Sequence, residues 1–517
     1  MRMRSGCAVV FIRWIRLCGV RVKAAVPAAM GCFLLALATV AQAATFNVNT
    51  FVDVPDVNPG DGVCETAAGN NACNLRAAIQ ETNALAGADT IVLQAGVTYT
   101  LGSVGQDDTA LSGDLDILDS VTIVGAGPAS TIIDGNGAVT SDRVFDIKRC
   151  RGNPQQPDCD VSHPPIVVSI SGVTIQHGNG PAGGGIVSGG SLTLTNCVVA
   201  NNAASGLNAW GGGIYSAGAL NISNSTISNN TAGPNNPFGG GIYAQGAIAI
   251  TGSTISGNST TGSFGSGGGL ILYFSPAGSI TNSTISGNTA FGNGGGLLMQ
   301  SGKVVNSTIS GNVSHAKGGG AAVTNSTFIN STVSGNFSYD DGGGIYAISG
   351  VTQLYHVTVT QNLANADDSG TAVAGGVYNA TANAFYSVNS IIALNETSIP
   401  DDPFPLLDTD DCAGSITSQG NSILYDVKIA HCTVSGTKSL VNPLLGPLQY
   451  NGGATKTHAL LDGSTAIDGG PVAVCVDDLG NPLASDQRGV HRPWGAQCDL
   501  GAYEAQPDLI FKNGFEP

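Results

Sequence analysis

The stretch Gly211-Gly-Gly-Ile-Tyr-Ser-Ala-Gly-Ala-Leu-Asn-Ile-Ser-Asn-Ser-Thr-Ile-Ser-Asn-Asn230 is the patterned part of one unit of a repeat that organises the centre of the chain. Leu220 and Ile222 alternate with polar residues, as in a strand with one buried face, whereas Ile227 is apolar at the opposite parity. The alternation slips by one residue, which requires a sharp bend between two strands. Asn224 lies at the slip, and asparagine tolerates the left-handed backbone that such a corner needs.

This unit recurs along the chain with a nearly constant period. A Gly-Gly-Gly run begins each copy, and successive runs are spaced by 28, 28, 28, 27, 24 and 24 residues, starting at Gly183, Gly211, Gly239, Gly267, Gly294, Gly318 and Gly342. The corner residue is asparagine or glycine in the other copies as well, at Asn196, Gly252, Asn282, Asn306 and Asn330. Short strands at this period, separated by glycine turns, predict a solenoid of stacked β-coils.

Each coil is predicted to contain three strands, which in the quoted unit are Gly213–Ser216, Leu220–Ser223 and Ser225–Ser228. Parallel strands of successive coils would stack about 4.8 Å apart, so that equivalent side chains form ladders along the axis. Connections between parallel strands are right-handed in nearly all proteins. The predicted fold is therefore all-β, a right-handed parallel β-helix with a short N-terminal capping helix and a disulfide-tied C-terminal cap.

One small polar position is expected to face the interior of each coil. Counting by parity from the buried aliphatic residues places a serine there in five coils, at Ser225, Ser253, Ser283, Ser307 and Ser331. Cys197 holds the equivalent position in its own coil. We therefore expect Cys197 to be a buried, unpaired thiol that packs as a small hydrophobic residue.

Residues 1–43 have the pattern of a secretory signal peptide. Six basic residues precede an apolar run from Ala24 to Val40, and Ala41-Gln42-Ala43 offers a small-residue cleavage site. An uncleaved anchor is the alternative, but the run is short for a membrane span and contains Pro27. Cleavage would leave no membrane span and 13 Lys and Arg against 36 Asp and Glu, a net charge of −23. Such a surface repels nucleic acid and suits a secreted protein that binds cations or neutral glycans.

The ends of a solenoid must be covered. Residues 44–118 are assigned to an N-terminal cap and the first strands, with an amphipathic helix within Cys73–Leu85 that Asn74 can cap. The repeats occupy residues 119–395, a C-terminal cap residues 396–504 and a tail residues 505–517. The first strands are expected at Thr90–Leu93, Ser120–Val124 and Thr131–Asp134.

Cysteines near both ends are spaced as local pairs. No pair has the spacing of a zinc site, and export permits disulfides. The predicted disulfides are Cys64 with Cys73, Cys150 with Cys159, Cys412 with Cys432, and Cys475 with Cys498.

Several segments resemble families of exported bacterial proteins. Cys73-Asn-Leu-Arg-Ala-Ala-Ile79 is similar to the Cys-Ser-Leu-Arg-Glu-Ala segment of one group of β-helix proteins, and departs from it at Asn74 and Ala77. The C-terminal run resembles the choice-of-anchor Q domain in its segments Asn451–His458, Ala466–Gly470, Asp486–Pro493 and Cys498–Glu504. The Gly-Gly-Gly-Ile and Ser-Gly-Asn repeats resemble those of polymorphic outer-membrane proteins. These resemblances imply a secreted or cell-surface, outer-membrane-associated protein with a pectin-lyase-like fold, and no particular activity.

Acidic residues are missing from most of the repeats. Residues 161 to 339 contain no Asp or Glu, so the first coils lack the two carboxylates that glycoside hydrolysis usually requires. One edge is an exception, where equivalent turns carry Lys317, His315, Asp340, Asp341, Asp367 and Asp368. Stacked together, these carboxylates could bind Ca²⁺ or act as acid and base, although an acidic turn balanced by lysine explains them as well. A polysaccharide lyase or glycoside hydrolase at this edge is the alternative hypothesis.

A second candidate for Ca²⁺ lies before Cys64, at Asp53, Asp56 and Asp61. Their spacing matches no EF-hand loop, and a turn rich in Asp, Asn, Pro and Gly explains them equally well. Calcium is the only cofactor that the sequence suggests, and no resident cofactor is required.

Aromatic residues recur at positions that should point away from the core. The residue after each inward aliphatic side chain faces outward by parity, and aromatic residues also occupy the preceding loops; together they are Tyr215, Tyr243, Tyr346, Tyr378, Trp210 and Phe238. Such a stripe can stack on sugar rings or dock a protein, although loop aromatics could instead shield the strand tyrosines. The main hypothesis is a scaffold that binds or adheres to glycans or a surface partner, rather than an enzyme. A third hypothesis is that the protein is a purely structural component of the cell surface.

Overall fold

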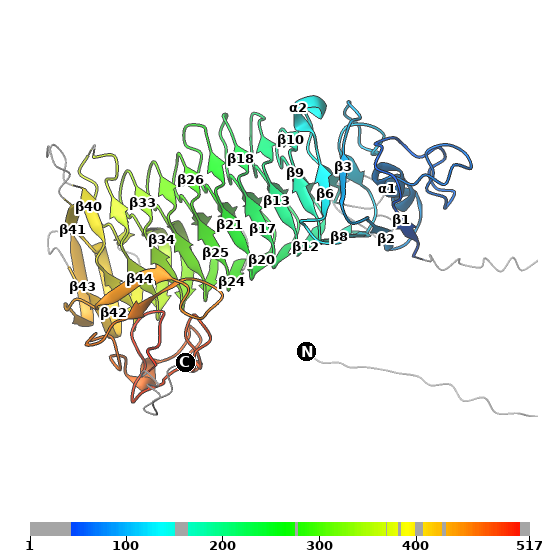
Figure 1. Cartoon of the computed structure of the whole chain (residues 1–517). Coiled ribbons are helices and arrows are strands. Elements are labelled where there is room, and N and C mark those ends of the chain that lie inside the picture. The colour runs from blue at the N-terminus through cyan, green and yellow to red at the C-terminus, as the bar shows by residue number, and fades with distance from the viewer. Residues whose placement is uncertain are drawn as a thin grey trace, which may run out of the picture. The chain divides into compact units, whose positions relative to one another are not determined.

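The computed structural model describes residues 43–149, 164–273, 278–368, 370–380, 384–398, 407–426 and 431–506. Figure 1 shows the coils stacked side by side from the blue N-terminal end to the yellow coils. The predicted right-handed parallel β-helix is confirmed. None of the described helices is long and apolar enough to cross a lipid bilayer.

The quoted unit forms β15 (Ile214–Ser216), β16 (Leu220–Ser223) and β17 (Thr226–Ser228), as its alternation predicts. A fourth, two-residue strand, β18 (Thr231–Ala232), follows them and belongs to a separate sheet. Two residues are too few to show an alternation, so this strand could not be predicted from the sequence pattern. Every one of these strands pairs in parallel with its equivalent in the next coil; Leu220, for example, lies opposite Ile248.

Equivalent strands form four columns along the axis. The first column contains β7 (Phe145–Ile147), β11 (Ile186–Ser188), β15, β19 (Ile242–Ala244), β23 (Leu270–Leu272), β27 (Leu297–Met299), β31 (Ala321–Ile329), β34 (Ile345–Tyr355) and β37 (Val377–Asn379). The second contains β5 (Val121–Val124), β8 (Val167–Ser171), β12 (Ser191–Thr195), β16, β20 (Ile248–Thr251), β24 (Gly278–Thr281), β28 (Gly302–Val305) and β38 (Phe385–Val388), with β31 and β34 continuing into it.

The third column contains β6 (Thr131–Asp134), β9 (Thr174–Gln176), β13 (Val198–Ala200), β17, β21 (Thr254–Ser256), β25 (Thr284–Ser286), β29 (Thr308–Ser310), β32 (Thr332–Ser334), β35 (Thr358–Thr360) and β39 (Ile391–Ala393). The fourth, separate sheet contains β10 (Asn179–Gly180), β14 (Ala203–Ala204), β18, β22 (Ser259–Thr260), β26 (Thr289–Ala290), β30 (Val313–Ser314), β33 (Phe337–Ser338), β36 (Leu363–Ala364), β40 (Glu396–Ser398) and β41 (Leu407–Thr409).

The corner between the second and third columns has the backbone that the sequence predicted. Asn224 has φ 48° and Gly252 has φ 58°, and the other corner asparagines are also left-handed, namely Asn196, Asn282, Asn306 and Asn330. The glycine runs are needed because coils approach closely at them. A Cβ atom on Gly212, for instance, would lie 2.2 Å from the carbonyl oxygen of Gly240 in the next coil.

Two polar ladders run through the apolar interior. In the predicted serine ladder, the Ser225 hydroxyl accepts from the main-chain N–H of Cys197 at 3.0 Å and donates to the carbonyl of Ser223 at 2.8 Å. Cys197 is buried and unpaired, as expected. A second ladder consists of buried asparagines, and every member after the first accepts one bond from the main-chain N–H and one from the side-chain amide of the asparagine before it. Its members are Asn202, Asn230, Asn258, Asn288, Asn312, Asn336, Asn362 and Asn395. Buried amide groups cost stability unless they are paired, and this stacking pairs them.

The N-terminal end is covered by helix α1 (Leu75–Ala84), which Asn74 caps by accepting from the N–H of Ala77 at 2.8 Å. Parallel pairing begins at β1 (Thr45–Asn47), which pairs with β2 (Asp89–Val92). Because β2 in turn pairs with β5, these two strands extend the second column toward the N-terminal end. The strands expected near residues 90, 120 and 131 are β2, β5 and β6, each within one residue of the predicted range.

The coil ladder continues at the other end into β42 (Cys412–Leu424) and β43 (Cys432–Ser439), which a disulfide joins. After them, β44 (Leu445–Gln449), β45 (Thr457–Leu460) and the short helix η1 (Val472–Val474) belong to a C-terminal segment, residues 445–506. Figure 1 shows this orange-to-red segment beside the later coils. The disulfides Cys64–Cys73 and Cys475–Cys498 also form, whereas Cys150 and Cys159 lie outside the described residues.

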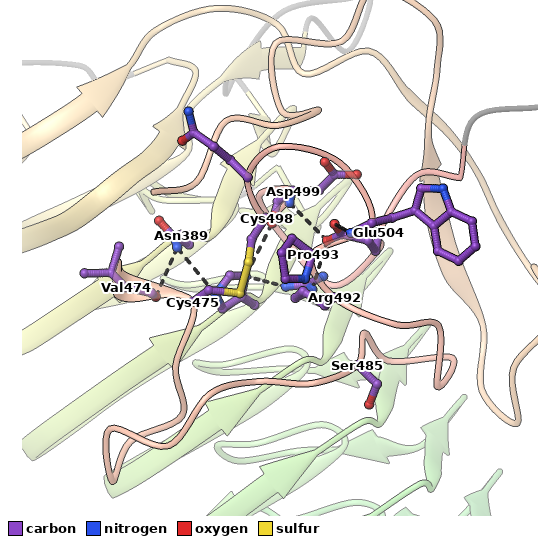
Figure 2. The surroundings of a disulfide bond; sticks show 12 residues. Asn389, Val474, Cys475, Ser485, Arg492, Pro493, Cys498, Asp499 and Glu504 are labelled. Carbon is purple, nitrogen blue, oxygen red and sulfur yellow. Dashed lines mark hydrogen bonds and ion pairs between the residues drawn. A yellow bond between two sulfur atoms is a disulfide. The ribbon is translucent and has the colours of Figure 1, made fainter. Parts of the chain in front are cut away.

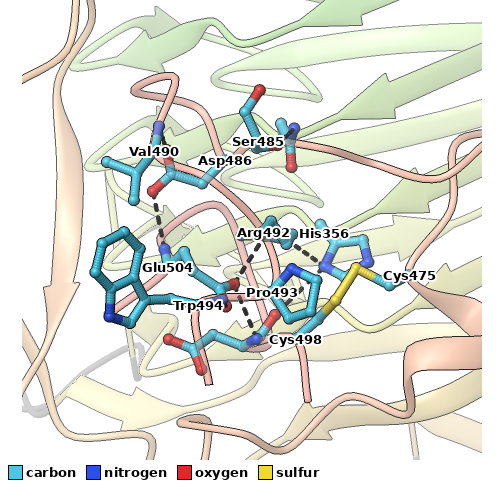
Figure 3. Close-up of polar contacts among 12 residues, drawn as sticks. His356, Cys475, Ser485, Asp486, Val490, Arg492, Pro493, Trp494, Cys498 and Glu504 are labelled. Atoms are coloured by element: carbon cyan, nitrogen blue, oxygen red, sulfur yellow. Dashed lines mark hydrogen bonds and ion pairs between the residues drawn. A yellow bond between two sulfur atoms is a disulfide. The ribbon is translucent and has the colours of Figure 1, made fainter. Parts of the chain in front are cut away.

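A buried polar network holds the C-terminal segment on the third column. The guanidinium of Arg492 contacts the imidazole of His356, which follows β34, and pairs with Glu504 at 3.1 Å (Figure 3). Burial and the charge of Arg492 lower the pKa of His356, so the imidazole is neutral. The Cys475–Cys498 disulfide lies against the same network, beside Asn389 (Figure 2). Arg492 and Glu504 of the C-terminal segment therefore supply contacts that fix this segment to the coils.

Candidate functional site

Aromatic residues of the first column gather over β15, β19 and β23. Tyr215 and Tyr243 lie opposite each other in register, and their rings stack with centroids 5.8 Å apart. Trp210, in the loop before β15, stacks on Tyr243 at 5.3 Å, and Tyr273 approaches the same ring at 6.2 Å. We refer to Trp210, Tyr215, Phe238, Tyr243 and Tyr273 as the aromatic cluster. Offset stacking at these distances is favourable, so the rings hold one another in place.

The cluster covers its central ring and leaves the outer rings accessible. Tyr243 points outward from its strand, as predicted, but only 5% of its surface is exposed because the loop aromatics fold over it. Burial raises the pKa of both Tyr215 and Tyr243, so their hydroxyls remain neutral hydrogen-bonding groups. The side-chain amide of Gln245 lies 3.4 Å from each hydroxyl. The loop aromatics therefore shield Tyr243 from solvent, whereas the other rings of the cluster remain partly exposed.

A groove of about 780 Å³ opens beside the aromatic cluster. Its lining residues are Trp210, Phe238, Tyr243, Gln245, Ile271, Tyr273, Leu298, Met299, Gln300, Thr324, Asn325, Ile348 and Ser349. Aromatic and aliphatic side chains make up most of this surface, and the carboxamides of Gln245, Gln300 and Asn325 add hydrogen-bonding groups. None of the described lining residues is charged. Apolar walls with a few fixed polar groups are typical of ligand sites.

The sequence reasoning missed several residues of this groove. Positions 271 and 298 are the outward-facing equivalents of Tyr243 in the next two coils. Gln245, Tyr273 and Gln300 each lie two residues after one of these three positions, and residues two apart on a strand share a face. Extending the parity count by one step would have found them. Asn325 belongs to the long strand β31 and has a positive φ of 48°, which the local pattern did not indicate.

The predicted stripe is divided into two parts. Tyr346 and Tyr378 stack on each other at 5.3 Å, and the ammonium group of Lys317 lies 5.1 Å from the first ring and 5.7 Å from the second. Between this pair and the aromatic cluster the equivalent positions are Ile271, Leu298 and Ala322, none of which is aromatic, and Ala322 is fully buried. The six predicted binding residues therefore do not form one continuous surface.

The acidic edge, which comprises Lys317, Asp340, Asp341, Asp367 and Asp368, contains an ion pair and a hydrogen-bonded carboxylate. Lys317 lies 2.7 Å from Asp341 and 3.5 Å from Asp340. Partial burial opposes the charge, but the hydrogen bond and charge of Asp341 raise the pKa of Lys317, which disfavours a role as a base. Asp368 accepts a bond from the Ser398 hydroxyl at 3.0 Å. Asp367 is exposed.

His315 lies in a separate stack of rings. It lies between Phe291 and Tyr339, at 4.5 and 4.3 Å. Within the described ranges, no three carboxylate, imidazole or thiolate side chains come together where they could hold a metal ion. The four aspartates of the acidic edge therefore do not form the calcium site that the sequence suggested.

The three N-terminal aspartates also have protein partners. Asp53 pairs with the buried Arg76 at 2.7 Å, so its charge is already compensated. Asp56 accepts from the N–H groups of Asn58 and Glu65, and Asp61 from the side chain of Asn58. The turn interpretation, rather than calcium binding, describes this segment.

A buried charged cluster near the N-terminal end was not predicted. Asp114 and Asp116 are buried beside Arg143 and Lys148, with Lys148 3.0 Å from Asp116. Burial, reinforced by the neighbouring carboxylates, raises the pKa of Asp114 to about 9. The two aspartates precede the two basic residues by 27 to 34 positions, and nothing local in the sequence brings the two pairs together.

Comparison with known proteins supports the fold. The family model described as "Right handed beta helix region" matches residues 161–364. Among solved structures, pectate lyase Pel9A is 13% identical, with a TM-score of 0.40 over 90% of this chain and 96% of that one. No curated protein matches the sequence significantly.

Proposed function

We propose that this protein is a β-helix scaffold that binds neutral glycans in the groove beside the aromatic cluster. The observation that carries the proposal is the arrangement of Trp210, Phe238 and Tyr273 around a groove that also offers carboxamides. Aromatic faces stack on the apolar faces of sugar rings, and carboxamides hydrogen-bond to hydroxyl groups. The groove runs along several coils, which suits an extended chain of sugars.

Charge favours an uncharged ligand. The described lining of the groove has no basic residue that could pair with a uronic acid, and the whole chain has a net charge of −17. A polymer of uronic acids would be repelled by such a surface. We therefore infer that neutral polysaccharides bind better than acidic ones.

A role outside the cytoplasm fits the cysteines. The described part of the chain contains three disulfides, and such bonds persist in oxidising compartments. Together with the signal-peptide pattern of residues 1–43 and the resemblance of residues 451–504 to an anchor domain, they support a secreted or cell-surface location. Adhesion through bound glycans is the role that follows.

Binding to a panel of polysaccharides tests the proposal. The purified protein would be run through native gels that contain xylan, glucomannan, mixed-linkage glucan or polygalacturonate, and reducing ends would be measured in parallel. We expect retardation by at least one neutral polymer, its loss in Tyr215→Ser/Tyr243→Ser, and its retention in the matched pair Tyr346→Ser/Tyr378→Ser. Retardation by none of the neutral polymers would refute the proposal. New reducing ends that disappear in Asp340→Asn/Asp341→Asn would instead establish the lyase or hydrolase hypothesis.

A further inference from the structure

A second cleft lies on the corner between the third column and the short fourth strands, near the N-terminal end. Its volume is about 520 Å³, and it is lined by Thr100, Asp134, Asn136, Gly137, Ala138, His177, Gly178, Asn179, Asn201 and Ala203. In Figure 1 this corner is found where β6 and β9 lead to β10 and the short helix α2 (Gly137–Thr140). Six of the ten lining residues have polar side chains, and the two titratable ones are Asp134 and His177.

Asp134 and His177 form an oriented pair in this cleft. Oδ2 of Asp134 accepts from Nε2 of Gln176 at 2.9 Å and lies 2.9 Å from Nδ1 of His177, while Oδ1 accepts from the N–H of Asn136 at 2.9 Å. Burial alone would raise the pKa of Asp134, but the bonds from Gln176 and His177 outweigh it and lower that pKa, so the carboxylate is ionised. A carboxylate only accepts hydrogen bonds, and Nδ1 must therefore carry the proton. Nε2 of a neutral His177 is then left with a free lone pair.

The backbone at His177 is unusual for its residue type. His177 has φ 56°, and the equivalent corner in later coils is occupied by Asn201 and Asn229, then by glycine at Gly257, Gly287, Gly311 and Gly335, and last by Gln361 and Leu394, which also have positive φ. Asparagine and glycine adopt this conformation at lower cost than histidine. The left-handed corner is thus a feature of the coil, and it fixes where the His177 side chain leaves the backbone. About half of the His177 side chain, 51%, is exposed to the cleft side of the molecule.

The cleft also contains a hydrogen-bond donor close in sequence to the histidine. Oδ1 of Asn179 accepts from the Ser205 hydroxyl at 3.0 Å, which leaves the Nδ2 amide to donate to a ligand. Nδ2 of Asn136 is bonded to the carbonyl of Leu101 at 3.2 Å, which leaves its Oδ1 as an acceptor. No described lining residue is a lysine or arginine, so the cleft suits an uncharged, hydroxyl-bearing ligand.

We propose that this cleft hydrolyses ester groups on neutral sugars, with His177 as general base and Asp134 as its positioning residue. Nε2 of His177 takes a proton from a water molecule as the water oxygen bonds to the acyl carbon. The carbonyl π electrons move to oxygen, and the Nδ2 amide of Asn179 stabilises the resulting oxyanion. The oxyanion then re-forms the carbonyl, the bond to the sugar oxygen breaks, and that oxygen takes the proton from Nε2. The products are a carboxylic acid and the free sugar hydroxyl, and no further reactant is needed.

Acetate release from acetylated xylan and from glucose pentaacetate tests this proposal. We expect release by the purified protein, a fall of at least about 100-fold in His177→Asn, and no change in His315→Asn, which alters a histidine outside the cleft. Asparagine is native to this corner in the next two coils, so His177→Asn should retain the fold, and its melting temperature would be measured as a check.

Asp134→Asn separates positioning from folding. Loss of the carboxylate should lower kcat by about 10- to 100-fold with little change in KM, because the imidazole is no longer held with Nε2 free, and Asp134→Glu should restore part of the rate. A folded Asp134→Asn variant with an unchanged kcat would contradict the assigned role of Asp134. Absence of acetate release by the unmodified protein, or release that persists in His177→Asn, would overturn the proposal as a whole.

Discussion

The carboxylate of Asp411 takes the place that an asparagine holds in the eight coils before it, from Asn202 to Asn395. Its Oδ1 accepts both the main-chain N–H of Asn395, at 2.9 Å, and the side-chain amide of Asn395, at 2.8 Å. Its Oδ2 accepts from the N–H of Asp426 at 2.7 Å. The asparagine ladder thus ends on an acceptor that carries a charge, and this makes one end of the ladder sensitive to pH.

Asp411→Asn should flatten the dependence of stability on pH. Burial raises the pKa of Asp411 to about 7 in the folded protein, whereas an aspartate in an unfolded chain titrates near ~3.9. The folded state retains a proton that the unfolded state loses, so Asp411 weakens the fold as pH rises through this window. Between about pH 4 and about pH 8 the free energy of unfolding should shift in favour of the variant by about 2–4 kcal/mol. Urea unfolding at both pH values would measure this, and parallel curves for the two proteins would contradict it.

Asn312→Ala should be strongly destabilising. The change leaves the N–H of Asn288 and the carbonyl of Ile285 without their partners, which now lie 3.0 Å away, in a buried position. Each unpaired group costs about 1–3 kcal/mol, so we expect a loss of about 2–4 kcal/mol. The matched control is Asn221→Ala on the exposed face of β16, which should change the melting temperature little.

Replacing Cys197, the one cysteine in the serine ladder, by serine should hardly change the stability of the protein. Cys197→Ser supplies a hydroxyl that can donate to the Thr195 carbonyl, as Ser225 donates to Ser223, so we expect a change in stability below about 1 kcal/mol. Ser225→Ala is the contrasting variant, because it removes the acceptor of the buried Cys197 N–H and should cost about 1–3 kcal/mol. Equal melting temperatures for the two variants would show that the ladder contributes nothing.

Glu504→Gln should loosen the C-terminal segment without unfolding the coils. Arg492 and Glu504 are both buried, and removing one charge leaves the other uncompensated, which costs about 3–5 kcal/mol. We expect faster hydrogen exchange and proteolysis confined to residues 445–506. Gln497→Ala, on the exposed surface of the same segment, is the control. Exchange that increases equally in the central coils would contradict a local effect.

Trp210→Ala should weaken glycan binding if the groove is the binding site. Its ring stacks on Tyr243 and lines the groove, and one aromatic contact contributes about 0.5–1.5 kcal/mol. The dissociation constant for the neutral polymer found in the gels should therefore rise by about 3- to 10-fold, as measured by calorimetry. A similar effect from Tyr378→Ala would place the binding surface elsewhere.

The coil could be predicted from sequence because its determinants are local. The slip at Asn224, the parity of Ile227 and the glycine runs all fall within one unit, and repetition makes each of them visible several times. The serine ladder followed from the same parity count. The asparagine ladder did not, because Asn230 follows Asn229, which occupies a second left-handed corner, and a pattern of asparagines does not tell corner from ladder.

The remaining features depend on contacts between distant residues. His356 and Arg492 are 136 positions apart, and no alternation pattern links a coil to a segment that packs on its outside. The groove and the second cleft likewise combine residues of several coils. Sequence patterns identified the aromatic stripe but not its division at Ile271, Leu298 and Ala322, because the sizes of the outward residues decide whether neighbouring rings can meet.

The glycine runs are spaced by 28 residues early in the stack and by 24 residues later, yet the buried ladders pass through both parts unbroken. Much of the difference lies in the loop before the run, which has six residues between Ala232 and Gly239 and three between Ser314 and Gly318. The residues that form the buried ladders are thus independent of the length of the surface loops. Loops can lengthen, shorten or exchange aromatic residues during evolution, while whole coils are gained or lost only in steps of about 4.8 Å along the axis.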